Sequence, residues 1–371
     1  MPLKKKSNLP RAVTLQLTEA CNLRCKMCYY WGETGCYSNA ETGRKPEILD
    51  FKLLKPVLHY LSSAKPFYSL FGGEPFLYPQ LEELILTVKG FGSIIDTPTN
   101  GTMLAEHASM LVRTGFDSVR VSIDGPHEIN DNQRGKGSYG KAMAGVETLY
   151  KEKLKVGKRA PFIDIIYTIT PANYLSIEQF FLEDLNLSAI DRVSIQMENF
   201  LTAEMGESYS KFLKSEFNLP SERYWRGALR SPDDFNRMNT RVLAQQVKKV
   251  HKRLESLGKK ILLLPPTFSQ ENLSAYLKAD WNKMIDTYHS CLVPWFSVDI
   301  TATGDLAPCH VYYDLIMGNL YEQSFEEIWN GDRYQRFREY MLQNKFMSIC
   351  PGCCILYLAG RKQRKDIKSN I

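Results

Sequence analysis

The sequence predicts an α/β fold: a partial (β/α)6 barrel of the TIM type, followed by a small cysteine-rich C-terminal domain. Two observations lead to this prediction. Within residues 13–197, short strand-like runs alternate with runs of helical periodicity. The nine cysteines fall into two groups, one ending at Cys36 and one starting at Cys291, with none between them. Strands and helices that alternate in this way form parallel βαβ units with right-handed crossovers.

Each element of the barrel follows from its own pattern. The helix over 48–61, for example, repeats leucine and valine at helical spacing. The predicted strands cover 13–18, 67–71, 93–99, 118–123, 162–170 and 192–197. The predicted helices cover 48–61, 80–89, 104–114, 139–151 and 177–185. In such barrels the C-terminal ends of the strands carry the chemistry, and the polar motifs of this chain follow these strands.

The pattern loosens after the sixth strand. Residues 235–257 are typical of one long basic helix, 260–264 of a further strand and 270–285 of another helix. We expect this region to bridge two domains and to contribute to a substrate pocket. The predicted division of the chain is a barrel (1–198), a helical bridge (199–290), an auxiliary domain (291–354) and a basic tail (355–371).

Composition excludes several classes of protein. The chain has 371 residues, of which 44% are hydrophobic and 24% charged, as expected for a globular protein. No apolar run approaches the roughly 18 residues that span a bilayer, and the basic start at 1–6 lacks the apolar run of a signal peptide. We therefore expect a cytoplasmic protein, in which nine cysteines favour metal binding or catalysis over disulfides. The net charge of +6 fits a mildly basic protein, or one with a phosphate-bearing, nucleotide or acidic-peptide substrate.

Three cysteines follow the first strand within eight residues. Cys21, Cys25 and Cys28 have the spacing C-x3-C-x2-C, so one loop can turn their thiolates toward one point. Thiolates select zinc or iron–sulfur clusters. Structural zinc is held by four ligands, but no fourth cysteine stands at a zinc-finger spacing and no histidine lies nearby in the sequence. Three cysteines on a four-iron cubane instead leave one iron open.

This motif resembles the signature of the radical S-adenosylmethionine (SAM) enzymes, with Met27 where the family usually has an aromatic or apolar residue. The resemblance implies a [4Fe–4S] cluster whose open iron binds the amino and carboxylate groups of SAM. It further implies that one electron cleaves SAM to methionine and a 5′-deoxyadenosyl radical, which abstracts a hydrogen atom from the substrate. The family fold is the same partial barrel.

The ends of the next strands supply candidate SAM ligands. The motif after the second strand has glycines that permit close approach and a carboxylate that can accept from an ammonium group. It is similar to the family motif that binds the amino group of SAM, whereas alone it would read as a plain strand-end turn. It comprises Gly72, Gly73, Glu74 and Pro75.

Further candidates follow the third and fourth strands. Asn100 is a candidate SAM ligand at the end of the third strand, and the resemblance implies a ribose contact from Ser122. Asp124 either contributes to that site or caps the following turn. Arg134, in a loop similar to the family's RG-x-GS segment, is expected to pair with the SAM carboxylate through its forked donors, the alternative being an exposed loop arginine. The aromatic residues after Cys28 either contact adenine or lie on a surface loop; they include Tyr29 and Trp31.

The C-terminal cysteines form a second pattern, C-x12-G-x4-C with a distant C-x2-C. This pattern resembles the auxiliary-cluster domain called SPASM, or its shortened form, twitch. A full SPASM domain has seven cysteines and two clusters, whereas no cysteine follows Cys354 here. Four thiolates saturate one cubane, so we predict one auxiliary [4Fe–4S] cluster that transfers electrons. The predicted ligands are Cys291, Cys309, Cys350 and Cys353.

Some assignments stay open at this point. By ligand count alone, a four-cysteine zinc site fits the second pattern equally well. Cys354 is an alternative ligand to Cys353. Cys36 is either an incidental thiol or a hydrogen-atom donor to a substrate radical, as in some epimerases of the family. No catalytic residue is assigned beyond the clusters.

The predicted function is that of a radical SAM enzyme of the oxidoreductase type, acting on a small-molecule biosynthetic substrate by oxidation or rearrangement. The first alternative is a maturase of a ribosomally made peptide, although only twenty residues precede Cys21, fewer than a leader-binding domain needs. The second is a non-catalytic metal-binding protein. We expect an electron donor such as flavodoxin or ferredoxin as partner, and neither a membrane nor a nucleic acid.

Overall fold

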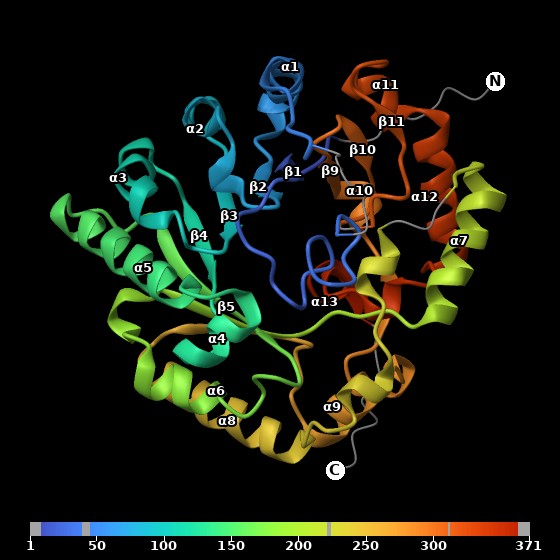
Figure 1. The fold of residues 1–371 in the computed structure, drawn as a ribbon. Helices are drawn as coiled ribbons and strands as arrows, with labels where there is room; N and C mark the ends of the chain where they lie inside the picture. Colours follow the sequence, from blue (N-terminus) through green and yellow to red (C-terminus); the bar gives the residue numbers. More distant parts are fainter. Residues whose placement is uncertain (1–8, 39–44, 221–223, 311, 363–371) are drawn as a thin grey trace, which may run out of the picture.

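A computed structural model describes residues 9–38, 45–220, 224–310 and 312–362. Its main feature is a ten-stranded sheet with the strand order β11-β10-β9-β1-β2-β3-β4-β5-β6-β7. Figure 1 shows the strands on the inside of an incomplete ring and helices around its outside. The predicted α/β barrel fold is thereby confirmed. No helix in the described ranges is long and apolar enough to cross a membrane.

Seven strands in chain order form the parallel core of the sheet, each paired with the next. Their alternating residues, such as Val119 and Val121, are buried against the helices. The strands are β1 (Ala12–Thr18), β2 (Phe67–Gly72), β3 (Ile95–Thr99), β4 (Ser118–Ser122), β5 (Phe162–Ile169), β6 (Arg192–Met197) and β7 (Lys260–Leu264). β7 lies in the region that the sequence assigns to the bridge, so that region completes the barrel wall.

The helices lie on the outer face of these strands and bury leucine-rich stripes. α1 begins after Asp50, whose carboxylate accepts from the backbone N–H of Lys52, and this cap explains why the helix starts three residues later than the predicted 48. The barrel helices are α1 (Phe51–Leu61), α2 (Leu81–Gly90), α3 (Leu104–Thr114), α4 (His127–Arg134), α5 (Ser138–Lys155) and α6 (Ile177–Gln179), which continues as a π-helix (Phe180–Asp184).

In the barrel and the bridge, two helices were missed by the sequence analysis. α4 occupies a segment that was expected to be a loop. This expectation arose because the segment is polar on average, and only the buried side chains of Asn130, Gln133 and Arg134 mark an inner face of the helix. The other is α7 (Ala203–Phe217). The bridge also contains α8 (Thr240–Ser256) and α9 (Gln270–Leu277), both shorter than predicted.

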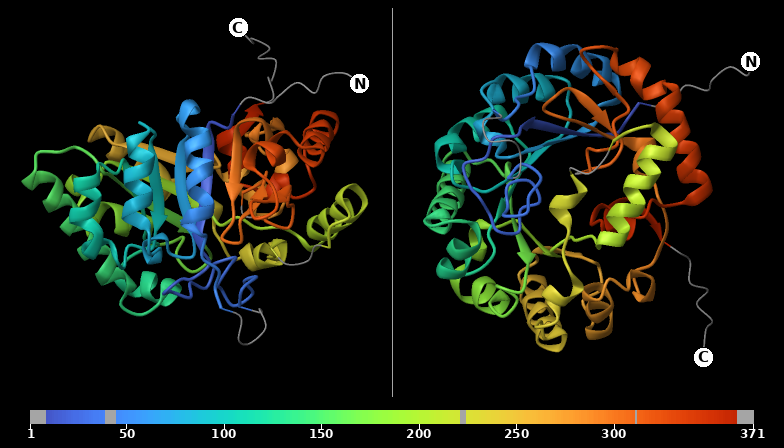
Figure 2. Two further views of the ribbon diagram at one scale, coloured as in Figure 1. Left: turned by 90° about the horizontal axis from the view of Figure 1, so that it is seen from above. Right: turned by 45° about the vertical axis from the view of Figure 1, so that its right-hand side comes forward.

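The C-terminal region is continuous with the barrel sheet. Its strand β9 (Ser297–Ile300) pairs in parallel with β1 and extends the sheet beyond the first strand. Next come β10 (Asp305–Ala307) and β11 (Gly318–Asn319). Around them lie α10 (Val293–Phe296), α11 (Phe325–Asn330) and α12 (Asp332–Asn344). Figure 2 shows this C-terminal region beside the first strands.

The predicted tail is partly structured. α13 (Ile355–Ala359) and β12 (Gly360–Lys362) lie within the range that the sequence assigns to a basic tail. β12 pairs antiparallel with β8 (Tyr288–Cys291), which precedes β9. Residues 355–362 are therefore structured: α13 is followed by β12, which pairs with the strand that carries Cys291. Residues 363–371 lie outside the described residues.

Candidate active site

The loop with the first three cysteines leaves β1 at its C-terminal end. Cys21, Cys25 and Cys28 are all partly exposed. A turn closes the loop, since the backbone N–H of Cys28 donates to the carbonyl of Cys25 at 3.0 Å. The N–H of Lys26 donates to the carbonyl of Gln133, near the end of α4, at 2.9 Å. The loop is thus held against the helix that carries Arg134.

The environment of Cys21 and Cys25 favours their protonated form until a metal replaces the proton. Burial raises the pKa of Cys21 to about 12. Burial also raises the pKa of Cys25 to about 11, although the nearby Arg134 guanidinium acts to lower it. Metal ligation requires the thiolate and displaces the proton, so these thiols are suited to be ligands more than to be free nucleophiles.

Gly72, the last residue of β2, and Gly73 pack closely against the backbone that precedes the cysteine loop. A Cβ atom on Gly73 would stand 2.0 Å from the carbonyl oxygen of Ala20. The N–H of Gly73 donates to the carbonyl of Thr18, and that of Glu74 donates to Ala20, both at 2.8 Å. Only glycine fits such a close approach of two backbones, which links the end of β2 to the residue before Cys21.

The carboxylate of Glu74 is fully buried and already has partners within the chain. It accepts from the Thr99 hydroxyl and from the backbone N–H of Asn100, both at 2.8 Å. It also accepts from the N–H of Phe76 at 3.2 Å. Burial raises its pKa to about 7, against these donors. In this structure Glu74 therefore ties the ends of β2 and β3 together.

Asn100 and Ser122 end neighbouring strands. The Nδ2 atom of Asn100 donates to the side-chain oxygen of Asn22 at 2.8 Å and lies 4.0 Å from the sulfur of Cys21. Ser122 ends β4 and is half-buried. The structure therefore brings Asn100 to the cysteine loop, whereas Ser122 stands one strand further along the sheet.

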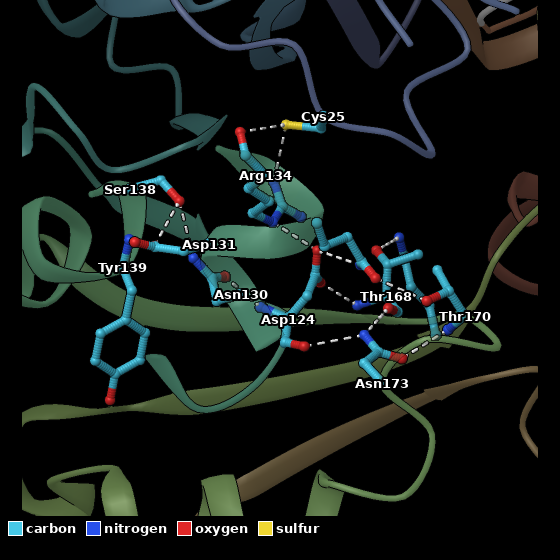
Figure 3. Close-up of polar contacts among 12 residues, drawn as sticks. Cys25, Asp124, Asn130, Asp131, Arg134, Ser138, Tyr139, Thr168, Thr170 and Asn173 are labelled. Carbon is cyan, nitrogen blue, oxygen red and sulfur yellow. Dashed lines mark hydrogen bonds and ion pairs between the residues drawn. The ribbon is translucent and has the colours of Figure 1, made fainter. Parts of the chain in front are cut away.

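A buried ion pair anchors Arg134 (Figure 3). Its Nε donates to Asp124 at 2.5 Å, and the Asp124 side chain is fully buried. The carboxylate also accepts from Gln133 at 3.0 Å and from the backbone N–H of Thr168 at 2.7 Å. Nη1 of Arg134 lies 4.0 Å from the sulfur of Cys25. Asp124 thus fixes the guanidinium beside the cysteine loop.

Sequence reasoning left the role of Asp124 open and did not anticipate its partners. Gln133 and Thr170 bond each other through their side chains at 2.7 Å, and Asn173 donates to the Asp124 carbonyl at 3.0 Å. These residues come from α4 and from the loop after β5, which no local motif connects. The one available signal was the Asp-Gly pair directly after a buried strand.

The second group of cysteines surrounds one cavity. Cys291, Cys309, Cys350 and Cys353 all line it. The rest of the wall is mainly apolar and includes Pro294, Tyr312, Phe337, Met341 and Met347. Cys354 lies outside the set of described residues that line this cavity.

Burial governs the thiols of this cavity. It raises the pKa of Cys350 to about 12 and the pKa values of Cys309 and Cys353 well above the ordinary range. Four thiols in an apolar cavity fit a closed cluster with four thiolate ligands. Within the described ranges, no three His, Cys, Asp or Glu side chains are gathered closely enough to hold a single metal ion.

Aromatic residues fill the space behind the first cysteine loop. Tyr30, Tyr37 and Tyr313 form a buried cluster that also encloses Cys36. The Trp31 indole donates to the carbonyl of Glu19 at 2.6 Å, and the Arg24 guanidinium lies over its ring. Cys36, which is 8% exposed, is therefore surrounded by the aromatic rings of this cluster.

The barrel, the three-cysteine loop at its strand ends and the four-cysteine cavity together define an enzyme class with an iron–sulfur cofactor. A protein-family model described as the radical SAM superfamily matches residues 15–181. A second family model, described as an iron–sulfur cluster-binding domain, SPASM, matches residues 291–354. The chain belongs to the radical SAM superfamily and carries a C-terminal SPASM domain.

Similarity to individual proteins extends over different lengths. The AdoMet-dependent heme synthase of Methanosarcina barkeri is 26% identical over 360 residues, which cover 94% of this chain and 92% of that protein. The mycofactocin maturase MftC of Mycobacterium tuberculosis is 31% identical over 143 residues, which cover 38% and 34%. Streptococcus suis SuiB bound to its precursor peptide SuiA has the same fold, with a TM-score of 0.61, 15% identity and coverage of 89% and 67%.

Proposed function

We propose that this enzyme abstracts a hydrogen atom from a small-molecule biosynthetic substrate and so oxidises or rearranges it. Cys21, Cys25 and Cys28 hold the SAM-binding [4Fe–4S] cluster in this proposal. One observation carries it: groups suited to SAM converge on the cysteine loop from separate strand ends. Arg134 approaches the sulfur of Cys25 and Asn100 that of Cys21, each to 4.0 Å.

The chain's own residues bind and orient the cofactor. When bound, the cluster and SAM supply a 5′-deoxyadenosyl radical. The Arg134 guanidinium, held through Nε by Asp124, offers its outer donors to a carboxylate. Gly72 and Gly73 allow the end of β2 to pack directly on the backbone of Thr18 and Ala20, which fixes the strand end that is proposed to bind the amino group. The strand ends at Asn100 and Ser122, together with the turn at Pro75, bound the remaining space.

The second cavity supports an auxiliary [4Fe–4S] cluster held by Cys291, Cys309, Cys350 and Cys353. A tetrahedral zinc ion draws its four sulfurs to about 2.3 Å from one point. The match of residues 291–354 to an iron–sulfur cluster-binding domain favours a cubane over such a zinc site. With all four irons ligated, this site transfers electrons and leaves no iron open for substrate.

The extent of similarity favours a small-molecule substrate. The heme synthase from Methanosarcina barkeri aligns along nearly its whole length. The tungsten-containing aldehyde ferredoxin oxidoreductase cofactor-modifying protein of Pyrococcus furiosus aligns over 92% of this chain and 86% of its own, at 24% identity. Peptide maturation is the second candidate, supported by the 31% identity to MftC over a shorter stretch. We propose a flavodoxin or ferredoxin as the electron donor in either case.

The test separates the radical chemistry from the substrate class. Anaerobically reconstituted protein is given dithionite and SAM, and 5′-deoxyadenosine is measured. A deproteinised extract of the source cells is then added, with or without prior protease digestion. A small-molecule substrate predicts stimulation that survives digestion. Stimulation lost on digestion identifies a peptide substrate, and the absence of deoxyadenosine under every condition contradicts the enzyme assignment.

A further inference from the structure

A short segment of the bridge crosses behind the first cysteine loop. We call residues 224–230 the strap. At one end, the carboxylate of Asp314 accepts from the backbone N–H groups of Tyr224 and Trp225 at 3.1 and 3.2 Å. Asp314 lies in the SPASM domain, between Cys309 and Cys350 in sequence. The strap is therefore tied to the domain that carries the second cysteine site.

The middle of the strap touches the residue that follows Cys28. A Cβ atom on Gly227 would stand 2.0 Å from the carbonyl oxygen of Tyr29. That carbonyl also accepts from the N–H of Cys36 at 3.0 Å. The backbones of the strap and of the cysteine loop are thus in direct contact, with no side chain between them.

Arg230, at the other end of the strap, holds three segments at once. Its Nη2 donates to the carbonyl of Met27, within the C-x3-C-x2-C motif, at 3.3 Å. Its Nη1 donates to the carbonyls of Leu229 at 2.7 Å and Gly227 at 3.2 Å. Its Nε donates to Glu198 at 2.9 Å. These acceptors match the planar fork of a guanidinium, which an ammonium group cannot reproduce.

The partner of Arg230 is fixed to the barrel. Glu198 directly follows β6, and its carbonyl accepts from the buried Tyr276 hydroxyl at 2.9 Å. The side chains of Arg230 and Glu198 are only 15% and 9% exposed. Water competes little at such a site, so the geometry of the pair is retained. Through Glu198, Arg230 thereby fixes the position of the Met27 carbonyl relative to the end of β6.

We propose that Arg230 is a positioning residue for the SAM-site cluster. It fixes the Met27–Cys28 end of the cysteine loop relative to β6 and, through the strap and Asp314, relative to the SPASM domain. This inference rests on the proposed assignment of Cys21, Cys25 and Cys28 to that cluster. A merely structural ion pair would stabilise the fold without affecting the cluster.

The experiment compares Arg230→Gln and Arg230→Lys with wild type in the full, reconstituted protein. Three quantities are measured on each sample: the thermal midpoint, the SAM-induced change in the electron paramagnetic resonance (EPR) spectrum after reduction, and the rate of deoxyadenosine formation. Arg230→Gln is expected to alter the SAM-responsive spectrum and to slow deoxyadenosine formation by about 100-fold, because small displacements at a reacting centre have effects of that order. Arg230→Lys restores a cation but not the fork, so we expect partial rescue.

Two further variants serve as controls. Glu198→Gln leaves the Arg230 contact to Met27 in place, so its effect on the spectrum should be smaller than that of Arg230→Gln. Arg113→Gln removes an exposed ion pair with Glu82, far from either cysteine site, and should match wild type. If Arg230→Gln fails to fold, the same three measurements on Arg230→Lys decide whether Arg230 positions the cluster.

The outcomes separate this inference from the proposed function. Variants of Arg230 with a lowered thermal midpoint but a wild-type SAM-responsive spectrum and rate would overturn the positioning role. Wild-type protein without any SAM-responsive spectrum would instead contradict the proposed cluster site itself.

Discussion

The two cysteine sites of this chain are built in opposite ways. The first is carried by one eight-residue loop, and polar groups from neighbouring strand ends surround it, among them Arg134 and Asn100. The second is gathered from segments up to 62 residues apart in sequence, and apolar side chains line it. With the proposed clusters, the same ligand type would serve two tasks, since a polar, incompletely ligated site can bind a charged cofactor and a closed apolar site cannot.

The largest effect is expected from the first site. Cys25→Ala should abolish deoxyadenosine formation and lower the iron content from about eight to about four per chain, because one four-iron cluster is lost. Iron and sulfide analysis with the deoxyadenosine assay checks this. Retention of deoxyadenosine formation would show that the two sites do not differ in the way described.

Removing a ligand of the second site should abolish substrate turnover but not deoxyadenosine formation. Cys353→Ala is expected to lose about four irons and substrate turnover, while deoxyadenosine still forms. Cys354→Ala is the matched control, because Cys354 does not line the cavity in the described structure, and it should keep its full iron content. The reverse pattern would exchange the roles of these two neighbours.

Deoxyadenosine formation is also expected to be sensitive to the close backbone contact at the first site. In Gly73→Ala the new methyl group meets the Ala20 carbonyl, which must move together with the cysteine loop. We expect a roughly 100-fold slower deoxyadenosine formation. Gly90→Ala is the control, since nothing lies within 4 Å of its Cβ position. Equal rates in the two variants would argue against close packing at the end of β2.

A smaller change is expected from the buried carboxylate. Asp124→Asn leaves Arg134 without its charged partner, so the guanidinium is less firmly placed and SAM binds more weakly, by roughly tenfold or about 1.4 kcal/mol. Isothermal titration with SAM measures this. Asp117→Asn removes a comparable ion pair with Lys89 away from the site and serves as control. An unchanged SAM affinity in Asp124→Asn would remove Asp124 from the site.

The last expected effect is on stability rather than on activity, and it depends on pH. Burial raises the pKa of Glu74 from about 4.5 in the unfolded chain to about 7. A raised pKa adds stability that is fully present below the unfolded value and is lost as pH rises through about 7. Relative to Glu74→Gln, the wild-type free energy of unfolding should therefore fall by about 3 kcal/mol between about pH 4 and pH 8. Denaturant titrations at both pH values test this, and parallel curves would contradict it.

Local patterns predicted much of the fold. β6 begins and ends at the expected residues 192 and 197, and so does α3 at 104 and 114, because apolar periodicity and flanking turn residues bound each of them. α4 was missed, since it is polar and is stabilised by the contacts of Arg134 and Gln133 with Asp124. The pairing of β9 with β1 was missed for a similar reason, as no local pattern records which strands pair across 285 residues.

The sites show the same limit. Spacing pointed to the first three cysteines, and similarity to the family motif pointed to the glycines after the second strand, because each group lies on a single loop. The partners that fix them come from distant segments, such as Asp124 for Arg134 and Arg230 for Met27. A buried hydrogen-bond network depends on how elements pack, and one sequence does not record that packing.

The most direct test of the account is the EPR spectrum of the reduced, reconstituted protein with and without SAM, recorded for wild type and for Cys291→Ala. The account predicts two overlapping signals in wild type, of which only one responds to SAM. That signal alone should survive in Cys291→Ala and still respond. A SAM response lost with Cys291 but kept in Cys25→Ala would place the open iron at the other site and contradict the central claim.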